Sequence, residues 1–314
     1  MNLLVSLKYL VALDDHKHFG RAALACHVTQ PALSNALRAL EAHFGTSIVK
    51  RGRSFAGFTE EGGRVLTSAR RILHEQESLQ QDLQSSAEQP RGNLLIGSVP
   101  TAMPIAARFV AMLQERHPGI TPALRSMSSV ELETGLESLA LDLGLGYTER
   151  MDASRALLRV LPQYTEHYFL LRKSQVPGAG DLRIGPSITW REASALPLCM
   201  LSAEMHNRTI VDRAFKSAGQ KVSPAIETNS TLTLLITVAA GKVCAVLPGA
   251  LLGSTLGYRE LEALPLSSPQ IEVPIALMLH ASNRPSRALE AALALAQDPA
   301  WLSQARQHAG RMQG

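Results

Sequence analysis

Residues Thr29 to Phe44 read TQPALSNALRALEAHF, and this stretch decides how the N-terminal part of the chain folds. Its apolar residues recur at intervals of three or four, which places them on one side of a helix: Leu33, Leu37, Leu40 and Phe44. Thr29 is a natural N-cap, and Pro31 suits a first turn because its missing N–H is not needed there. The stretch therefore predicts an amphipathic helix that begins beside Thr29.

The other side of this helix is polar, because it carries Gln30, Ser34, Asn35 and Arg38. The preceding segment 19–25 (FGRAALA) is rich in small residues and predicts a short helix that packs closely on its neighbour. The two helices predict a helix-turn-helix whose second member reads the major groove of DNA. Periodicity alone would equally suit any amphipathic helix of an α-helical domain, so the flanking sequence has to decide.

The flanking sequence resembles the N-terminal signature of LysR-type transcriptional regulators. Residues 18–45 (HFGRAALACHVTQPALSNALRALEAHFG) and the basic segment 48–62 (IVKRGRSFAGFTEEG) carry the resemblance, which is specific over about the first sixty residues. The resemblance implies a cytoplasmic DNA-binding regulator that is not an enzyme and needs no cofactor. It also implies promoter DNA, a small-molecule co-inducer, RNA polymerase and further copies of the chain, as a dimer or tetramer, as partners.

Positive charge is concentrated where DNA would be contacted. Residues 1–58 hold seven Lys and Arg against three Asp and Glu, whereas the remaining residues are balanced at 24 against 24. The net charge of +4 therefore lies in the helix-turn-helix part. This distribution fits contact with phosphate, although a solvated basic face would look the same.

The segment 48–59 that follows is short, β-permissive and basic, which predicts a two-stranded wing anchored by Phe55 and Phe58. Its basic side chains suit the minor groove, and they equally suit solvent. The predicted DNA-contacting residues are Thr29, Gln30, Pro31, Ser34, Asn35, Arg38, Lys50, Arg51 and Arg53. We expect the amides and Ser34 to meet base edges, and the basic residues to meet phosphate or the minor groove.

Residues 60–86 predict a long helix with one narrow apolar stripe, which is typical of a coiled-coil seam. The seam residues are Val65, Ala69, Ile72, Gln76, Leu79 and Leu83. We expect a dimerisation helix, which the family resemblance also implies, and the alternative is that the helix packs on its own domain. A dimer predicts a partly palindromic DNA site.

Beyond residue 92 predicted strands alternate with helices, which favours a mostly parallel α/β sheet that closes with one final helix near 287–304. Chain crossings near 161 and 266 resemble the two-lobed, periplasmic-binding-protein-like effector domain of the same family.

The predicted organisation is α/β overall. It has a winged helix-turn-helix DNA-binding domain at 1–59, a dimerisation helix at 60–87, a hinge at 88–92 and an effector-binding domain at 93–314. Within the effector-binding domain, lobe I is predicted at 93–161 and 266–314, and lobe II at 162–265.

Ligands of open α/β sheets bind beyond the C-terminal ends of the strands, where helix N-termini offer free N–H groups. Hydroxyl and amide side chains at those positions predict a site for a small metabolite, with a carboxylate as the favoured class. Ordinary helix capping explains each residue taken alone. The predicted effector-binding residues are Ser98, Val99, Pro100, Thr101, Ser128, Ser129, Met205, Thr228 and Asn229.

An enzyme and a metal protein are the first rival interpretations. Gly144-Leu145-Gly146 lacks the third glycine of a dinucleotide loop, and no phosphate-binding loop, G-x-S-x-G or H-E-x-x-H motif occurs. His16, His18, Cys26 and His27 cluster in the sequence without a second pair at metal-ligand spacing. Catalysis is unsupported, and packing or surface roles are favoured for the cluster.

Thiol-based redox sensing is the second rival, because segments 10–23 and 25–31 resemble a peroxide-responsive member of the same family. Such sensing needs a reactive thiolate near a second cysteine. Cys199 and Cys244 lie in apolar predicted strands and look like buried small hydrophobes, which disfavours the switch. The longest apolar stretch, 232–247, is interrupted by Gly241 and Lys242, so no membrane span is expected.

Overall fold

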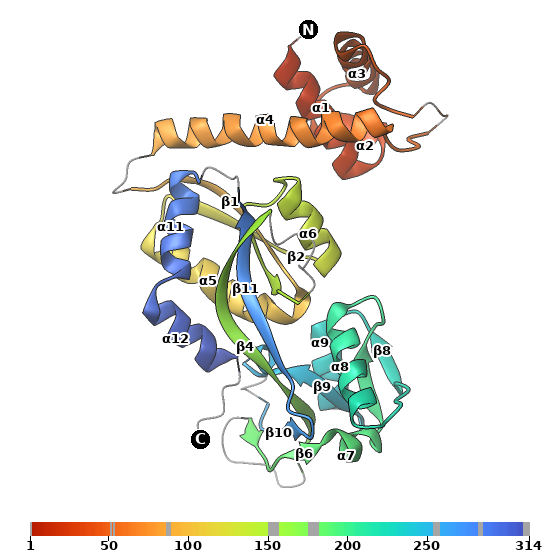
Figure 1. Cartoon of the computed structure of the whole chain (residues 1–314), viewed down its shortest axis with the longest axis vertical. Helices are drawn as coiled ribbons and strands as arrows, with labels where there is room; N and C mark the ends of the chain where they lie inside the picture. Colours follow the sequence, from red (N-terminus) through yellow and green to blue (C-terminus); the bar gives the residue numbers. More distant parts are fainter. Residues whose placement is uncertain are drawn as a thin grey trace. The chain divides into compact units, whose positions relative to one another are not determined.

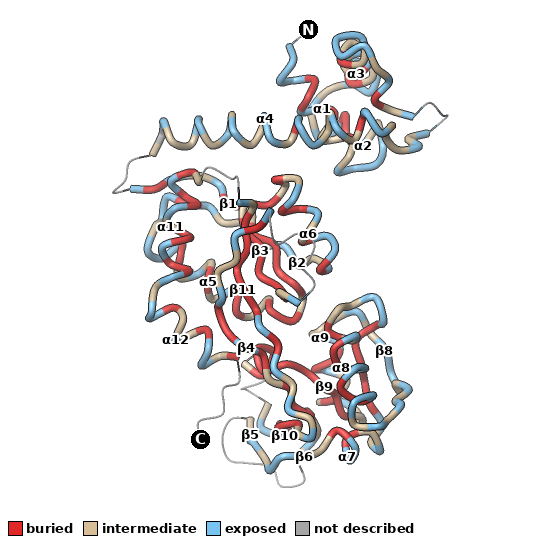
Figure 2. Tube along the Cα trace, viewed as in Figure 1, coloured by how far each residue is buried: buried red, intermediate tan, exposed pale blue. Residues whose placement is uncertain are grey.

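The computed structural model describes residues 2–50, 52, 54–85, 89–149, 157–174, 182–253, 258–281 and 285–309. Apart from two short segments, the chain divides at Ser85 into two compact units. Figure 1 shows the elements of both units, and Figure 2 shows long buried stretches along β3, β4 and β11 of the C-terminal unit.

Four helices form the N-terminal unit: α1 (Leu3–His16), α2 (Phe19–Ala25), α3 (Gln30–Phe44) and α4 (Glu60–Gln84). The helix-turn-helix prediction is confirmed in its elements, because α2 and α3 occupy the expected segments. The Oγ1 of Thr29 accepts a hydrogen bond from the Ala32 N–H at 3.3 Å, and Gly45 ends α3 in a left-handed conformation. Leu33, Leu37 and Leu40 are buried as expected, but Phe44 is 45% exposed at the helix end.

Within the described residues, the pairing in the predicted wing is an antiparallel bridge between Val49 and Phe58. Glu41 of α3 holds its base, because its Oε1 accepts the Ile48 and Val49 N–H groups at 2.8 and 3.1 Å. The rings of Phe55 and Phe58 lie 5.1 Å apart and pack against the core of the unit, as predicted.

Helix α4 begins where predicted, since the Thr59 Oγ1 accepts the Gly62 N–H at 2.9 Å. The predicted seam needs correction over its first half. Ala69 is completely buried in the core of this unit, and Val65 packs against the same core because α1 lies beside α4. Ile72, Leu79 and Leu83 remain exposed, by 44%, 61% and 79%.

The C-terminal unit is built on a mixed sheet in the order β2-β1-β3-β11-β4-β9-β7-β8, with β10 pairing with β4, β5 and β6. Its strands are β1 (Gly92–Ser98), β2 (Ile120–Ser126), β3 (Leu143–Tyr147), β4 (Leu158–Lys173), β5 (Arg183–Ile184), β6 (Ile188–Thr189), β7 (Leu198–Leu201), β8 (Ile226–Thr228), β9 (Cys244–Pro248), β10 (Leu261–Ser267) and β11 (Glu272–His280). Its helices are η1 (Pro100–Ala102), α5 (Met103–Arg116), α6 (Ser129–Glu137), α7 (Trp190–Ser194), α8 (His206–Ser217), α9 (Thr231–Ala240), α10 (Gly249–Leu252), α11 (Arg287–Ala296) and α12 (Pro299–His308).

The sheet is parallel only among its outer strands, because β4 and β11 run antiparallel to their neighbours. The first part of β4 pairs with β11, and its last part pairs with β9 and β10. One strand therefore belongs to two lobes. The first lobe contains β1, β2, β3, β11 and the start of β4, and the second contains the end of β4 with β7, β8, β9 and β10.

A bulge interrupts β4 where the register with β11 shifts between Ile275 and Ala276, which pair with Tyr164 and Pro162. The extra residue, Gln163, is buried. Its Nε2 donates to the Ala296 carbonyl at 3.2 Å, and its Oε1 accepts from the Trp301 indole N–H at 2.6 Å. The bulge therefore ties β4 to the two C-terminal helices.

The single final helix expected near 287–304 is two helices, α11 and α12. Asp298 caps the second one, since its Oδ1 accepts the Ala300 N–H at 2.8 Å, and Pro299 follows directly. Because proline lacks an N–H and clashes with the preceding turn, α11 cannot continue through it.

Candidate functional site

The outer face of α3 presents polar side chains to solvent. Gln30, Pro31, Asn35 and Arg38 are exposed and Ser34 is half-buried. Thr29 is also exposed and caps the helix. Within the described residues no ion pair engages Arg38 or Lys50, so both charges are available to another molecule. The face therefore offers amides, a hydroxyl and cationic groups on a rigid helix.

The basic tip of the predicted wing is described only in part. Lys50 is exposed, directly after the bridge residue Val49. Arg51 and Arg53 lie outside the described residues.

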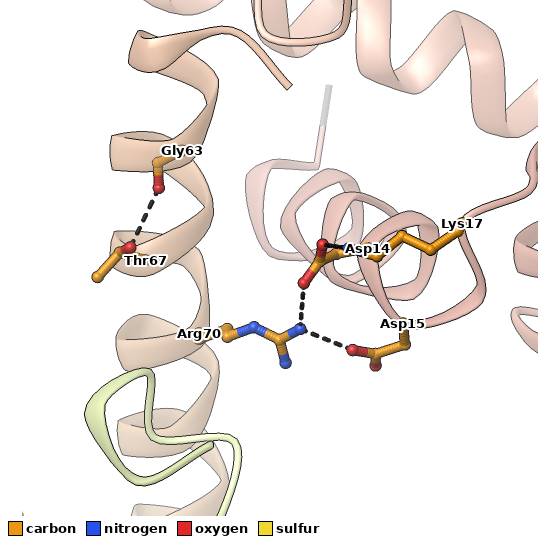
Figure 3. A network of polar contacts seen from close by, with 6 residues as sticks. All are labelled: Asp14, Asp15, Lys17, Gly63, Thr67 and Arg70. Carbon is orange, nitrogen blue, oxygen red and sulfur yellow. Dashed lines mark hydrogen bonds and ion pairs between the residues drawn. The ribbon is translucent and has the colours of Figure 1, made fainter. Parts of the chain in front are cut away.

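An ion-pair network that sequence patterns did not reveal joins α4 to α1 (Figure 3). Arg70 donates to Asp14 at 2.7 Å and to Asp15 at 2.6 Å, and its side chain is only 12% exposed. Burial alone would raise the pKa of Asp14, but hydrogen bonds from Lys17 and Arg70 outweigh it and lower that pKa. The network holds the first half of α4 against the end of α1. The Asp14-Asp15 pair was its only signal in the sequence.

A buried polar cluster joins the two lobes of the C-terminal unit, and it is called the inter-lobe cluster here. Its members are Thr101, Tyr147, Tyr164, Glu166, Tyr168 and Asn207. In the first lobe the hydroxyls of Thr101 and Tyr147 are hydrogen-bonded at 2.7 Å. Asn207, at the start of α8 in the second lobe, donates to the hydroxyls of Tyr147 at 3.3 Å and Tyr168 at 3.0 Å. The ring of His206 packs edge-on against that of Tyr147, with centroids 4.9 Å apart.

Glu166 is the acidic member of this cluster and is completely buried. Burial raises its pKa to about 8, and the Ala250 N–H, which donates to its Oε2 at 3.3 Å, and the neighbouring Tyr164 hydroxyl lower that pKa only in part. Among the described residues, neither Oε1 of Glu166 nor the Tyr164 hydroxyl has a hydrogen-bond partner of normal geometry. The carboxyl is therefore protonated at neutral pH and incompletely satisfied.

Of the predicted effector-binding residues, only Thr101 enters the inter-lobe cluster. Ser98, Val99 and Thr101 are all buried at the end of β1, and Pro100 beside them is half-buried. The Ser98 hydroxyl donates to the Val99 carbonyl at 3.1 Å. The first cluster of predicted residues thus lies where the lobes meet, because η1 also packs against α10 of the second lobe.

The other predicted residues make local contacts and are not hydrogen-bonded to the cluster within the described residues. The Ser128 Oγ accepts the Glu131 N–H at 3.2 Å and is a helix cap, whereas the adjacent Ser129 hydroxyl is buried without a partner among the described residues. Met205 precedes α8 as its N-cap residue. Thr228 accepts the Ser230 N–H at 3.2 Å, and Asn229 is exposed.

The predicted effector-binding residues did not include the three tyrosines, Glu166 or Asn207. A signal was present, because Tyr164, Glu166 and Tyr168 alternate along β4 and so project from the same face of the strand. A separate cavity of about 770 Å³ lies along β4 and β11, and none of the predicted effector residues lines it. Tyr164 is the member of the inter-lobe cluster that does.

The cysteines are placed unfavourably for a thiol switch. Cys199 of β7 pairs with Ala245, while Cys244 of β9 pairs with Leu198, so the two thiols project from opposite faces of the sheet. They belong to different apolar clusters, and burial raises the pKa of both thiols. A disulfide between them would require rebuilding the strands.

Two further properties concern metals and membranes. No group of three or more His, Cys, Asp and Glu side chains placed to hold a metal ion occurs in the part of the chain that the structure describes. Within the same residues, every helix is too short or too polar to cross a bilayer.

Comparison with solved structures shows the fold. A full-length OxyR from Pseudomonas aeruginosa with a Cys-to-Asp substitution superposes with a TM-score of 0.68 at 24% identity, over 92% of this chain and 95% of that one. CbnR in complex with its target DNA gives a TM-score of 0.62 at 18% identity, over 96% and 99% of the two chains.

Comparison of sequences shows the family. Residues 4–63 match the bacterial regulatory helix-turn-helix protein, lysR family, and residues 87–300 match the LysR substrate binding domain. The hydrogen peroxide-inducible genes activator of Pectobacterium carotovorum subsp. carotovorum is 30% identical over 279 residues, which are 87% of this chain and 88% of that protein. Its counterpart in Dickeya chrysanthemi is 31% identical over 246 residues, 77% of either chain. The chain therefore belongs to the LysR family of DNA-binding transcriptional regulators, which are not enzymes.

Proposed function

We propose that the chain binds a partly palindromic promoter site as a dimer, or as a tetramer of two dimers, and that a small molecule bound between its lobes changes this contact and transcription. The observation that carries the DNA-binding part is the outer face of α3, where Gln30, Asn35 and Arg38 are exposed on a helix whose opposite face is buried. Such a face is preorganised for the major groove.

Two groups of side chains have different roles in this proposal. Gln30, Ser34 and Asn35 offer hydrogen-bonding groups that can distinguish base edges. Arg38 and Lys50, together with the basic side chains of the wing tip, neutralise phosphate or enter the minor groove. Changes in the first group should relax sequence preference, and changes in the second should weaken binding to all sequences.

The test is binding of the purified chain to the DNA upstream of its own gene, in a salt series with excess nonspecific competitor. We expect a competitor-resistant footprint with dyad symmetry. The double variant Ser34→Ala, Asn35→Ala should lose about 1–3 kcal/mol of discrimination per lost base contact. Lys50→Ala should keep the preference and reduce the salt slope by about one. A double variant that preserved both affinity and preference would refute the role given to α3.

Dimerisation through the distal half of α4 is supported by the exposure of Ile72, Leu79 and Leu83 on a helix that continues beyond its own core. Half-buried Gln76 lies within the same stretch. We expect Leu79→Glu combined with Leu83→Glu to convert dimers to monomers in analytical ultracentrifugation. Glu77→Gln, on an exposed position of the same helix, is the matched control and should leave the mass unchanged.

Effector binding at the inter-lobe cluster is supported by the buried hydrogen bonds that Asn207 of one lobe makes to Tyr147 of the other, and by the unsatisfied carboxyl of Glu166. A ligand that replaces these contacts alters the relation between the lobes. We propose that this change re-angles the paired α4 helices, and with them DNA bending and contact with RNA polymerase.

A second candidate is a response to hydrogen peroxide, because the relatives from Pectobacterium and Dickeya are hydrogen peroxide-inducible genes activators. The raised pKa of the Cys199 and Cys244 thiols and their opposite orientations argue against a cysteine-based route. The test is footprinting before and after peroxide treatment, with the triple Cys→Ser variant as control. A peroxide-dependent footprint that this variant loses would establish the second candidate.

A further inference from the structure

The inter-lobe cluster contains one carboxyl, and within the described residues no ion pair involves it. The carboxyl of Glu166 receives a hydrogen bond from the Ala250 N–H, and its Oε1 is buried without a donor of normal geometry among the described residues. Glu166 and Glu149 both add to burial in raising the pKa of Tyr147 and Tyr168. When Glu166 is ionised, the local field therefore favours positive charge.

The aromatic neighbours of Glu166 strengthen this preference. Tyr164 and Tyr168 project from the same face of β4 as Glu166, and Tyr147 faces them from the end of β3. Faces of tyrosine rings attract ammonium groups, and their hydroxyls accept hydrogen bonds from them. A buried carboxyl surrounded by tyrosines is thus complementary to an organic cation.

We infer that the inter-lobe cluster binds a small molecule through a protonated amine, with the ammonium group donating to Glu166 Oε1 and to the hydroxyl of Tyr164. This inference rests on the proposed function, since it names the class of effector. It replaces the carboxylate that the hydroxyl-rich positions at the helix N-termini predicted, because none of the described residues of the cluster is a Lys or Arg that could neutralise an anion.

Binding of this kind exchanges a proton for the ligand. Free Glu166 is protonated below about pH 8, so an ammonium ion has to displace the carboxyl proton into solvent. Apparent affinity should therefore rise about tenfold per pH unit between pH 6 and 7.5 and level off above pH 8. The other titratable or charged groups facing the cluster are the three tyrosines on β3 and β4, Glu149 after β3, and His206 on α8 with Arg213 beside Glu149.

The experiment compares three probes that share a propyl chain: propylammonium, 1-propanol and butyrate. Thermal shifts of the full chain are recorded with each probe at pH 6, 7 and 8.5, and footprints on the upstream DNA are run beside them. We expect propylammonium to stabilise the wild type, with the pH dependence given above. Neither 1-propanol nor butyrate should produce a comparable shift.

The matched variants are Glu166→Gln and Glu115→Gln, the second on an exposed position of α5. Glu166→Gln should bind propylammonium at least tenfold more weakly and without pH dependence, while Glu115→Gln should behave as the wild type. Cooperative unfolding of Glu166→Gln checks that the variant folds. His206→Gln should retain the pH dependence, because the exchanged proton belongs to Glu166.

The outcomes distinguish the proposed amine class of the ligand from the proposed regulatory function. Butyrate binding that changes the footprint, with no response to propylammonium, overturns the amine class and leaves the regulatory function standing. Propylammonium binding that leaves the footprint unchanged supports the site chemistry and counts against the regulatory role of the cluster. Absence of any propylammonium shift at pH 8.5, or an equal shift with Glu166→Gln, overturns the inference.

Discussion

The outer face of α3 and the inter-lobe cluster are both rich in amides and hydroxyls, but they differ in burial. On α3 the groups are exposed and the apolar residues beneath them are packed, so the helix is rigid and its polar atoms are free for a partner. In the cluster the polar atoms are buried and largely bonded to one another across two lobes. The first arrangement suits recognition of a large charged surface, and the second suits a small ligand that must replace existing contacts.

The two regions also differ in what a polar group without a protein partner indicates. A surface amide without a protein partner is hydrogen-bonded to solvent, so the missing protein partner says little about function. An unpaired buried carboxyl oxygen costs free energy unless it is protonated or meets a donor, so Glu166 marks a position of functional interest. The following changes test how firmly each region depends on its packing.

The largest effect is expected at Gly62, where the wing meets α4. A Cβ at this position would lie 2.1 Å from the carbonyl oxygen of Ile48, which is backbone and cannot move without disrupting the wing. Gly62→Ala should destabilise the N-terminal unit by about 4 kcal/mol and abolish specific DNA binding.

Gly63 is the matched control, because a Cβ there meets nothing within 4 Å. Gly63→Ala should be neutral or slightly stabilising, by about 0.5 kcal/mol. Thermal unfolding and footprinting check both, and equal stability of the two variants would contradict the contact.

The next effect concerns Glu166 and is a dependence on pH. Because its pKa in the folded chain is about 8, above the usual 4.5, the unfolded state releases a proton that the folded state retains. This group therefore makes stability fall as pH rises from about 4.5 to 8. Glu166→Gln should remove that dependence and raise stability at pH 8 by about 4 kcal/mol relative to wild type. Urea unfolding at pH 5 and pH 8 measures this dependence of stability on pH, with Glu115→Gln as the control. A steeper fall of stability with pH in Glu166→Gln than in the wild type would contradict the raised pKa of Glu166.

A smaller effect is expected from Arg70, whose network holds α4 against α1 (Figure 3). Arg70→Met leaves the largely buried Asp14 with Lys17 as its remaining described cationic partner and should cost about 1.5 kcal/mol. Since the pKa of Asp14 is lowered in the folded chain, its contribution exists above the usual value of 3.8 and disappears as pH falls below it. The cost should therefore shrink at pH 3. Arg64→Met, at an exposed position of the same helix, should cost less than about 0.5 kcal/mol. A constant cost between pH 3 and 7 would contradict the ion pair.

The smallest effect is expected from Thr101→Val, which keeps the shape of the side chain and removes the hydroxyl bonded to Tyr147. The loss should be about 1 kcal/mol, because the Tyr147 hydroxyl retains the bond from Asn207. Thr228→Val is the control outside the inter-lobe cluster. Denaturant midpoints measure the loss of stability, and footprints with and without the effector measure the response to it. An unchanged response in Thr101→Val would mean that the Thr101 hydroxyl contributes to stability alone.

How far the sequence predicts the structure depends on how local the determinants are. Helices α2 and α3 follow from small residues, a Thr cap and a three-to-four periodicity, all contained in thirty residues. The Glu41 contact with the wing and the Arg70 network join positions separated by seven and by more than fifty residues, so no local pattern announces them.

In the C-terminal unit the alternation of strands and helices is predictable, because continuous apolar runs mark short buried strands such as β3 and β7. The full length of β4 is not predictable in this way, since Pro162 argues against a central strand and a bulge accommodates it. The inter-lobe cluster was found at Thr101 alone, because the bonds that assemble it come from β3, β4 and α8, and their convergence depends on the whole fold.

The shared strand β4 also limits how the two lobes can move. Sixteen consecutive residues form one backbone that is hydrogen-bonded to β11 in the first lobe and to β9 and β10 in the second. The lobes therefore cannot separate like the halves of a clasp without breaking sheet hydrogen bonds. Any change in the relation of the lobes therefore has to twist or bend β4 itself. A ligand at Glu166, three residues beyond the bulge at Gln163, would act directly on this shared strand.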